Sequence, residues 1–272
     1  MAIKQIQRTF ELFAFHSAFR SHWDADFSFV GESHNFWELV YVVSGVVEVT
    51  EDAQVYRLSE GNLLLHAPME FHKICSAEGT CPQVMITSFS VIGALPTHLT
   101  QGVFTLSEGE RQEFTGLFKR IHRFFLSEHS ETHHGQECAD CLSSFLIRLS
   151  ENHATREQLS MSRDTQLYST LVDTMTRNVR SNLSLEDIAE QCLISVSYMK
   201  VLFHRYAGIS PKAYFSRLRC TEATKLLQDG YSSSEVADMM HFSSVNYFSV
   251  FFKRMTGMPP MAFLRQNTST PR

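Results

Sequence analysis

The sequence lacks a long apolar run. Although 43% of its 272 residues are hydrophobic, no segment approaches the roughly 20 consecutive apolar residues of a membrane-spanning helix. The start, Met1–Gln5, has no apolar core of the signal-peptide type. Cysteine is also scarce, because six residues do not reach the density of a secreted disulfide scaffold. We therefore expect a cytoplasmic protein without a membrane partner, long enough for two domains.

An excess of positive charge is missing too. The formal net charge is −5 and the pI about 6.2, which over the whole chain does not indicate a nucleic-acid-binding protein. The charge is uneven, however. Residues 166–272 carry 12 Lys and Arg against 8 Asp and Glu, a formal charge of about +4, which leaves about −9 on residues 1–165. This division predicts a basic C-terminal domain that follows an acidic N-terminal one.

One pattern occurs twice in the C-terminal third. Tyr198 and Tyr247 are 49 positions apart, and so are Phe203 and Phe252. In each copy a short apolar stripe with helical spacing is followed by a serine and then by a second apolar stripe. The pattern predicts a helix-turn-helix unit that occurs twice.

The second helix of each unit is expected to begin after Ser195 or Ser244, both good N-cap residues. One face of each of these helices is apolar and the opposite face carries short or polar side chains, which is typical of a helix that packs on one side and contacts a DNA groove with the other. The side chains expected to contact DNA are Ser195, Ser197, Lys200, Val201, His204, Ser244, Val245, Asn246, Ser249, Val250 and Lys253.

A single long helix is expected between the two units. Ser210 is its N-cap candidate, and Pro211 occupies the first helical position, where the missing N–H of proline costs nothing. Apolar residues at helical spacing continue to Leu227, before Asp229–Gly230.

These positions together resemble the AraC-type (arabinose-regulator) family of transcription factors. The resemblance covers roughly the last third of the chain, and so many spaced positions make it specific. The matching residues are Ile188-Ala189, Ser195-x-x-Tyr198-Met199-x-x-x-Phe203, Gly208-x-Ser210-Pro211, Arg219-x-x-x-Ala223-x-x-Leu226-Leu227, Val236-Ala237, Phe242, Tyr247-Phe248-x-x-x-Phe252-Lys253 and Gly257-x-x-Pro260.

The chain departs from the pattern of this family at three positions. Val201 and Val250 stand where the family often has arginine, so a bidentate contact with guanine is replaced by contact with a thymine methyl group. His241 stands where a turn glycine is expected, so a left-handed residue there would be strained, unless the turn is built differently. Direct base readout is therefore expected to depend on Lys200 and Asn246.

Residues 10–95 have the composition of strands that are separated by turns. Several short strands at regular spacing predict a barrel or jelly roll. The clearest strand candidates are Glu38–Val43, Val46–Thr50, Val55–Leu58, Asn62–His66 and Val84–Phe89.

Two spaced motifs in this region are similar to those of cupins. The first places His34 and Glu38 between Gly31 and Gly45, and the second ends at His72. The AraC-type resemblance implies that such a barrel binds a small organic effector, which we expect to contact His34, Phe36, Glu38 and His72.

A metal site in the barrel is the alternative interpretation. His34, Glu38 and His72 could hold a metal ion with an open coordination position. The first histidine of the usual cupin pair is replaced by Glu32, so the ligand set is incomplete. We therefore expect no metal and no other cofactor, and interpret these side chains as the lining of an organic-ligand pocket.

Aromatic residues are concentrated at the start of the sensor region. They would suit stacking on a sugar or an aromatic ring, and they would equally suit an ordinary barrel core. These residues are Phe10, Phe13, Phe15, Trp23, Phe27, Phe29, Phe36 and Trp37.

Residues 107–152 change to helical periodicity. Phe114 to Phe125 form one apolar stripe and Cys138 to Leu149 another. Such a pair looks like the helices through which the resembled family often dimerises, and simple packing on the barrel is the other interpretation. Cys138 and Cys141 are expected to be packed small residues rather than zinc ligands, because no second ligand pair has zinc-site spacing.

The predicted fold is α+β. Its parts are a cupin-like effector-binding barrel (1–105), a helical pair (106–152), a linker (153–165) and an all-α DNA-binding domain with two helix-turn-helix units joined by a long helix (166–267). The predicted function is a ligand-responsive bacterial transcription regulator, acting as a homodimer on double-stranded DNA and gated by a small organic effector such as a sugar or aromatic compound. The alternatives are a metal-dependent cupin enzyme fused to a DNA-binding module and a purely architectural DNA-binding protein. We assign no catalytic residue, because no nucleophile–base motif is visible.

Overall fold

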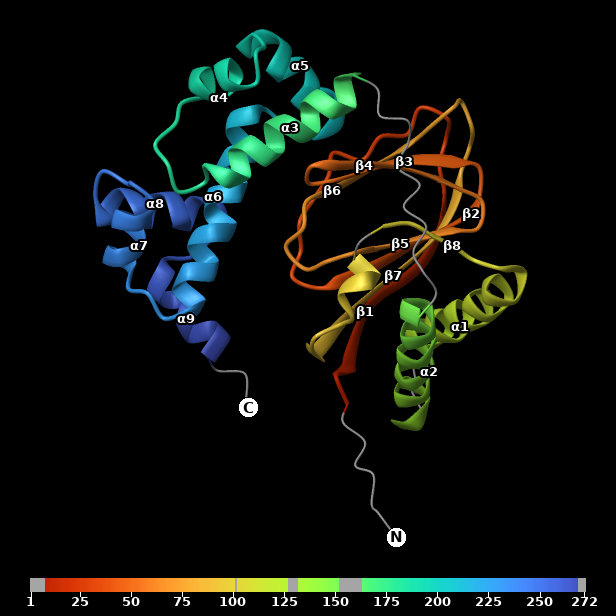
Figure 1. Ribbon diagram of the computed structural model, residues 1–272. Coiled ribbons are helices and arrows are strands. Elements are labelled where there is room, and N and C mark those ends of the chain that lie inside the picture. The colour runs from red at the N-terminus through yellow and green to blue at the C-terminus, as the bar shows by residue number, and fades with distance from the viewer. Residues whose placement is uncertain (1–7, 101, 127–131, 152–162, 269–272) are drawn as a thin grey trace. The chain divides into compact units, whose positions relative to one another are not determined.

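The computed structural model describes residues 8–100, 102–126, 132–151 and 163–268 (Figure 1). The chain divides into two compact units, residues 1–160 and 161–272. Strands and two helices make up the first unit, and the second is helical, so the predicted α+β class is confirmed.

The first unit contains two antiparallel sheets. One has the strand order β1-β7-β2-β5-β8 and the other β4-β3-β6. Among the described residues no ladder joins the two sheets into one closed barrel, and isolated bridges such as Glu32 to His72 connect the segment before β2 to the smaller sheet. The strands are β1 (Phe10–His22), β2 (Trp37–Ser44), β3 (Val46–Glu51), β4 (Gln54–Ser59), β5 (Asn62–His66), β6 (His72–Ser76), β7 (Gln83–Gly93) and β8 (Phe104–Thr105), with a 3-10 helix at Thr97–Thr100.

The larger sheet separates two hydrophobic cores. Because successive side chains of a strand point to opposite faces, Val40 and Val42 of β2 join the core shared with the smaller sheet. Leu39 and Tyr41 join the core on the other face. This alternation places one end of β2, at Glu38, on the side that faces the smaller sheet.

Helices α1 (Glu108–Leu126) and α2 (Thr132–Glu151) pack on the outer face of the larger sheet (Figure 1). Phe114 and Ile121 of α1, with Leu142 and Leu146 of α2, are buried in the same core as Leu39. The apolar stripes that suggested dimerisation are therefore used for packing within one chain. Cys138 is buried and Cys141 half-buried against this core, in agreement with their expected packing role.

The second unit consists of helices in its described part. Most of the predicted linker, residues 153–162, lies outside the described residues, and Arg163–Thr165 begin α3. The helices are α3 (Arg163–Arg177), α4 (Leu185–Gln191), α5 (Val196–Tyr206), α6 (Pro211–Gln228), α7 (Ser233–Met239), α8 (Val245–Thr256) and α9 (Pro260–Thr268). None of the helices in the described ranges is long and apolar enough to cross a membrane.

Serine caps fix where these helices begin. The hydroxyls of Ser195, Ser210 and Ser244 accept hydrogen bonds from backbone N–H groups in the first turns of α5, α6 and α8. Ser184 and Ser232 form complete capping boxes with the third residues of α4 and α7, an arrangement that satisfies N–H groups which would otherwise lack partners. Two copies of the same helix-turn-helix unit result, joined by the long helix α6, as the repeat predicted.

Both turns contain a left-handed residue that is not glycine. Leu193 has φ +56° and His241 has φ +53°. In each turn the next residue, Ile194 or Phe242, donates its N–H to a carbonyl five residues earlier, which is the hydrogen bond of a Schellman helix end. The left-handed turn considered from the sequence is therefore present at His241, and the first unit has it too.

Candidate functional site

Helix α5 has one buried and one exposed face. Met199, Leu202 and Phe203 are fully buried, so the rotation of the helix about its axis is fixed. The opposite face presents Lys200 and Val201, the latter 58% exposed. A helix held in this way offers its outer side chains at defined positions to a groove.

Helix α8 repeats this arrangement. Phe248 and Phe252 are fully buried, whereas Val250 is 68% exposed. Asn246 lies exposed in the first turn, and Ser249 is the one expected contact residue that is half-buried. Ten of the eleven side chains expected to contact DNA are thus exposed on α5, on α8 or at their N-caps.

The two units differ at their repeated tyrosines. The Tyr198 hydroxyl donates to Asp164 of α3 at 2.6 Å, so this side chain is held against its own domain. Tyr247 is 58% exposed and has a ring contact with Phe242 at 6.0 Å. Sequence reasoning treated the two as equivalent and did not count Tyr247 as a contact residue. The two tyrosines differ because Tyr198 has a hydrogen-bond partner in α3, and only the tertiary structure shows this partner.

The expected effector residues meet at one end of the two sheets. Glu38, near the start of β2, is paired in register with His66 at the end of β5 and with Ser88 on β7. On the smaller sheet, Glu51 at the end of β3 is paired with His72 at the start of β6. Facing strands therefore bring these polar side chains together, although they are far apart in sequence.

Glu38 is the centre of this cluster. Its Oε1 lies 3.5 Å from His72 Nε2, and its Oε2 lies 3.8 Å from His34 Nε2. Ser88 donates a hydrogen bond of 3.0 Å to Oε2. Phe36 stacks on the ring of His34 with centroids 3.8 Å apart. The structure thus brings together all four residues expected at the effector site.

His66 and Glu51 belong to the cluster and were not expected from the sequence. The His66 ring stacks on that of His72 with centroids 4.2 Å apart, and its Nδ1 contacts Glu51 Oε1. Their side chains are only 1% and 5% exposed. His66 ends an apolar run and Glu51 begins a turn, so the pattern favoured structural roles for both. Only the pairing of the strands shows that they are neighbours.

Burial disfavours the charged forms of the carboxyl and imidazole groups at this end of the sheets. Burial raises the pKa of the Glu38 carboxyl to about 7, against the opposing effect of the Ser88 hydrogen bond. Burial also lowers the pKa of His66 to about 3 and that of His72 to about 2, and neighbouring imidazoles add to both shifts. Burial therefore favours the neutral forms of both histidines and opposes full ionisation of Glu38 near neutral pH, and a ligand that brings hydrogen bonds or a compensating charge is favoured here.

The cluster also contains sets of possible metal ligands. Glu38, His66 and His72 offer ligand atoms within 4.8 Å of one another, and so do Glu51, His66 and Glu70. Imidazole and carboxylate are ligands for first-row transition metals.

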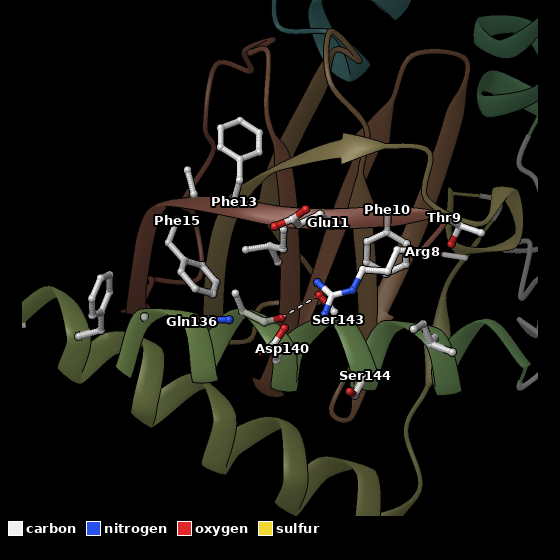
Figure 2. A pocket seen from close by; sticks show the side chains of 16 residues that line it. Arg8, Thr9, Phe10, Glu11, Phe13, Phe15, Gln136, Asp140, Ser143 and Ser144 are labelled. Atoms are coloured by element: carbon white, nitrogen blue, oxygen red, sulfur yellow. Dashed lines mark hydrogen bonds between the residues drawn. The ribbon is translucent and has the colours of Figure 1, made fainter. Parts of the chain in front are cut away.

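A cleft of about 930 Å³ lies elsewhere, between β1 and α2. Figure 2 shows Arg8, Glu11 and Phe13 on the strand side and Asp140 and Ser143 on the helix side. None of the expected effector residues lines it. The cleft and the Glu38 cluster are therefore separate candidates for the effector site.

Two family models match the chain. One, described as an AraC-like ligand binding domain, matches residues 16–167. The other, described as a helix-turn-helix domain, matches residues 188–266. The first contains the Glu38 cluster, and the second contains α5 and α8.

Similar proteins are transcriptional activators. The chain is 24% identical over 255 residues to the HTH-type transcriptional activator RhaR of Shigella dysenteriae, with 88% of each chain covered, and equally to RhaR of Escherichia coli. Among solved structures, ToxT from Vibrio cholerae is 13% identical with a TM-score of 0.39, covering 97% of this chain and 100% of that one. An AraC-type DNA-binding regulator from Chromobacterium violaceum is 28% identical with a TM-score of 0.36, covering 38% of this chain and 93% of that one.

Because the chain is similar to transcriptional activators, it is grouped with regulators rather than with enzymes. The ligand-binding model alone spans more than half of the chain. The chain therefore belongs to the AraC family and is a ligand-responsive transcription regulator, with an N-terminal ligand-binding domain and a C-terminal helix-turn-helix DNA-binding domain.

Proposed function

We propose that α5 and α8 contact successive major-groove segments of double-stranded promoter DNA, and that a small organic effector bound at the Glu38 cluster changes this binding. The observation that supports the DNA half is the matching pair of capped helices, each with one buried face and one exposed face. The convergence of His34, Phe36, Glu38 and His72 supports the effector half.

The exposed faces of the two helices differ in what they can recognise. Val201 and Val250 offer only apolar contact, which suits the methyl group of thymine. Asn246 can pair bidentately with adenine, and Lys200 can donate to guanine or to a phosphate. The serine caps leave the N-termini of α5 and α8 exposed, and their helix dipoles favour phosphate. The combined surface supports recognition of A·T-rich steps more than of G·C-rich ones.

We favour the Glu38 cluster over the β1–α2 cleft as the effector site. Its polar groups come from both sheets and are largely buried, so an effector would exchange water for directed hydrogen bonds. The cleft is lined by exposed side chains, among them Asp140 and Phe13, and gives less enclosure. Phe36 stacks on both His16 and His34, with centroids 4.6 and 3.8 Å away, and so helps to position His34 at the site.

We also propose a cytoplasmic homodimer without enzymatic activity. Most of the two apolar stripes of α1 and α2 is buried in their own unit. The subunit contact would therefore use the residues left exposed, such as Phe125, Leu126 and Ile147, which are 42%, 71% and 46% exposed. Sedimentation equilibrium of the wild type and of Leu126→Glu tests this surface. A monomeric wild type would contradict the dimer.

Footprinting tests the proposed contacts of α5 and α8 with DNA. Fragments selected from genomic DNA by the purified chain should show two protected major-groove blocks per subunit, about 34 Å apart on one face of the DNA. Val201→Glu and Val250→Glu place a carboxylate on exposed positions, so both variants should fold. Each should lose one block, and the two lost blocks should differ. A single block in the wild type would show that only one unit contacts DNA, and blocks that both variants leave unchanged would show that neither exposed face does.

A further inference from the structure

The imidazoles of His66 and His72 are oriented by acceptors on the side away from Glu38. His66 Nδ1 contacts the Glu51 carboxyl, and His72 Nδ1 lies 3.4 Å from the Glu70 carbonyl oxygen. For His72, an acceptor at Nδ1 keeps the ring proton on that atom and leaves a lone pair on Nε2. This is the arrangement found around histidines that bind metal ions, whose second nitrogen donates to a carboxylate or a carbonyl. His66 Nδ1 lies against the Glu51 carboxyl without a hydrogen bond.

The Nε2 atom of His72 is left without a hydrogen-bond partner. It is buried, and the Glu38 carboxyl at 3.5 Å does not form a hydrogen bond with it. The Nε2 of His34, which also faces Glu38, is in the same situation. Buried polar atoms without partners are rare because each costs about 1–3 kcal/mol. The His72 atom, which faces the Glu38 carboxyl, therefore indicates a ligand between these two side chains.

We propose that Glu38, His66 and His72 bind one divalent first-row transition-metal ion. Their ligand atoms lie within 4.8 Å of one another, and the 3.5 Å between His72 Nε2 and Glu38 Oε1 is close to the roughly 3.4 Å edge of a tetrahedron with bonds of about 2.1 Å. Two imidazoles and one carboxylate suit zinc, iron, cobalt or nickel, whereas magnesium and calcium prefer oxygen ligands alone.

This ligand set differs from the one that the sequence suggested. The cupin-like motifs offered His34, Glu38 and His72, without a fourth ligand, and we expected no metal from them. His66 lies within the second motif, Gly61 to His72, at a position that the motif leaves unspecified. It supplies the missing imidazole, while Glu51 acts as a positioning residue behind it. A divalent cation also balances the carboxylates that burial makes costly here.

The inference rests on the proposed effector site and deepens it. Three protein ligands leave at least one coordination position for another molecule. His34 and Phe36 are more exposed than His66 and His72, so a molecule bound beside them would reach the ion from there. The effector would then be a small compound with an oxygen donor, such as a hydroxyl or carboxylate group.

Metal titration of the full-length chain tests the proposal. The purified protein is stripped with EDTA and titrated with Co²⁺, whose absorption reports its ligands, and with Zn²⁺ in competition with a chromophoric chelator. We expect one ion per chain. Glu38→Gln and His72→Gln should weaken binding at least 100-fold, and Glu51→Gln should weaken it about 10- to 100-fold with an unchanged Co²⁺ spectrum. His98→Gln, which removes an exposed histidine from the 3-10 helix, should have no effect.

Glu38→Gln keeps the volume of the side chain and replaces a buried carboxyl with an uncharged amide, so it provides a folded variant even where histidine variants do not fold. Less than stoichiometric binding by the wild type, or undiminished binding by folded Glu38→Gln, would overturn the proposal. DNA binding of EDTA-treated and metal-loaded protein, with and without the small-molecule fraction of a cell extract, separates the two ideas. An effector response that persists without metal would support the effector site and contradict a role of the ion in it. Stoichiometric metal binding without any response would support the metal site and contradict the effector site.

Discussion

His241 adopts a left-handed backbone conformation in the turn of the second helix-turn-helix unit, with φ +53°. This conformation costs a residue with a Cβ about 1–2 kcal/mol, and glycine avoids the cost. We expect His241→Gly to stabilise the DNA-binding unit by roughly 0.5–1 kcal/mol, because the greater freedom of unfolded glycine offsets part of the gain. Denaturant unfolding of the full chain measures this change.

A matched control is His204→Gly, which places glycine at an exposed position inside α5. That variant should lose about 1 kcal/mol. If His241→Gly also destabilised the unit, the His241 side chain would be making a contact that outweighs the strain of its backbone.

Asn246 and Lys200 test direct readout at single residues. Each good base contact contributes roughly 1–3 kcal/mol of discrimination, so Asn246→Ala should relax the preference at one base pair by about 5- to 150-fold. Lys200→Ala should either relax one position or weaken binding to all sequences equally, which would indicate a phosphate contact. Binding is measured against operators with every base substituted in turn, at a fixed salt concentration.

Lys225→Ala is the control for the Asn246 and Lys200 variants, since Lys225 is an exposed lysine on α6 outside both contact faces. Uniform weakening of all operator variants by Asn246→Ala would show that Asn246 contacts the backbone of the DNA.

At the scale of single residues, the sequence predicted the exposed face of each helix well, because helical periodicity fixes it. It did not distinguish Tyr198 from Tyr247, because Asp164, the partner of Tyr198, lies in another helix.

Arg219 connects several elements of the DNA-binding unit. Its guanidinium donates to the carbonyl oxygens of Val179 and Ser181 at 3.2 and 2.9 Å, between α3 and α4. It also donates to the Met240 carbonyl at the end of α7, and lies 4.7 Å from the Phe242 ring centroid. One guanidinium thus holds two carbonyl groups of the α3–α4 connection and one at the end of α7.

Arg219→Met keeps most of the apolar stem and removes all these donors. Hydrogen bonds from a charged group contribute about 1.5–3 kcal/mol each and do not add fully, so we expect a loss of about 2–4 kcal/mol in the stability of the DNA-binding unit. Thermal unfolding followed by circular dichroism measures it. Arg205→Met is the control, because Arg205 is 60% exposed in its ion pair with Asp164, and such pairs contribute at most about 1 kcal/mol. Equal effects of the two variants would remove the connecting role of Arg219.

The elements themselves were predicted unevenly. The five strands bounded from the sequence correspond to β2, β3, β4, β5 and β7, because each has a β-branched or apolar run between turn residues. Strand β1 was not bounded, and its pairing with β7 contains two register shifts, between Leu12 and Ala14 and between Phe15 and Ser17. Such bulges interrupt the period of two on which strand prediction depends. The short strand β6, with the sequence HKICS, has no clear alternation.

At the scale of the whole molecule, the sequence predicted two functional parts with different folds and different charge. The cupin-like motifs also located His34, Glu38 and His72 at one site, because the motif spacing reflects the pairing of strands. His66 and Glu51 could not be predicted in this way, since their proximity depends on which strands face each other across the two sheets. The β1–α2 cleft was missed for the same reason, as it is formed by residues more than a hundred positions apart.

The last prediction concerns the connection between the two units. Glu38→Gln and His72→Gln should abolish the response of DNA binding to the effector, because they remove the carboxyl group and the imidazole at the centre of the cluster. Affinity for the operator without effector should stay within about threefold of wild type, or roughly 0.6 kcal/mol, because the contact residues lie in the other unit. The measurement is operator binding with and without a cell-extract fraction. Asp140→Asn is the matched control, since Asp140 lines the β1–α2 cleft and is exposed. If Asp140→Asn lost the response while both cluster variants kept it, the effector would bind in the cleft and the Glu38 cluster would be left with a structural role.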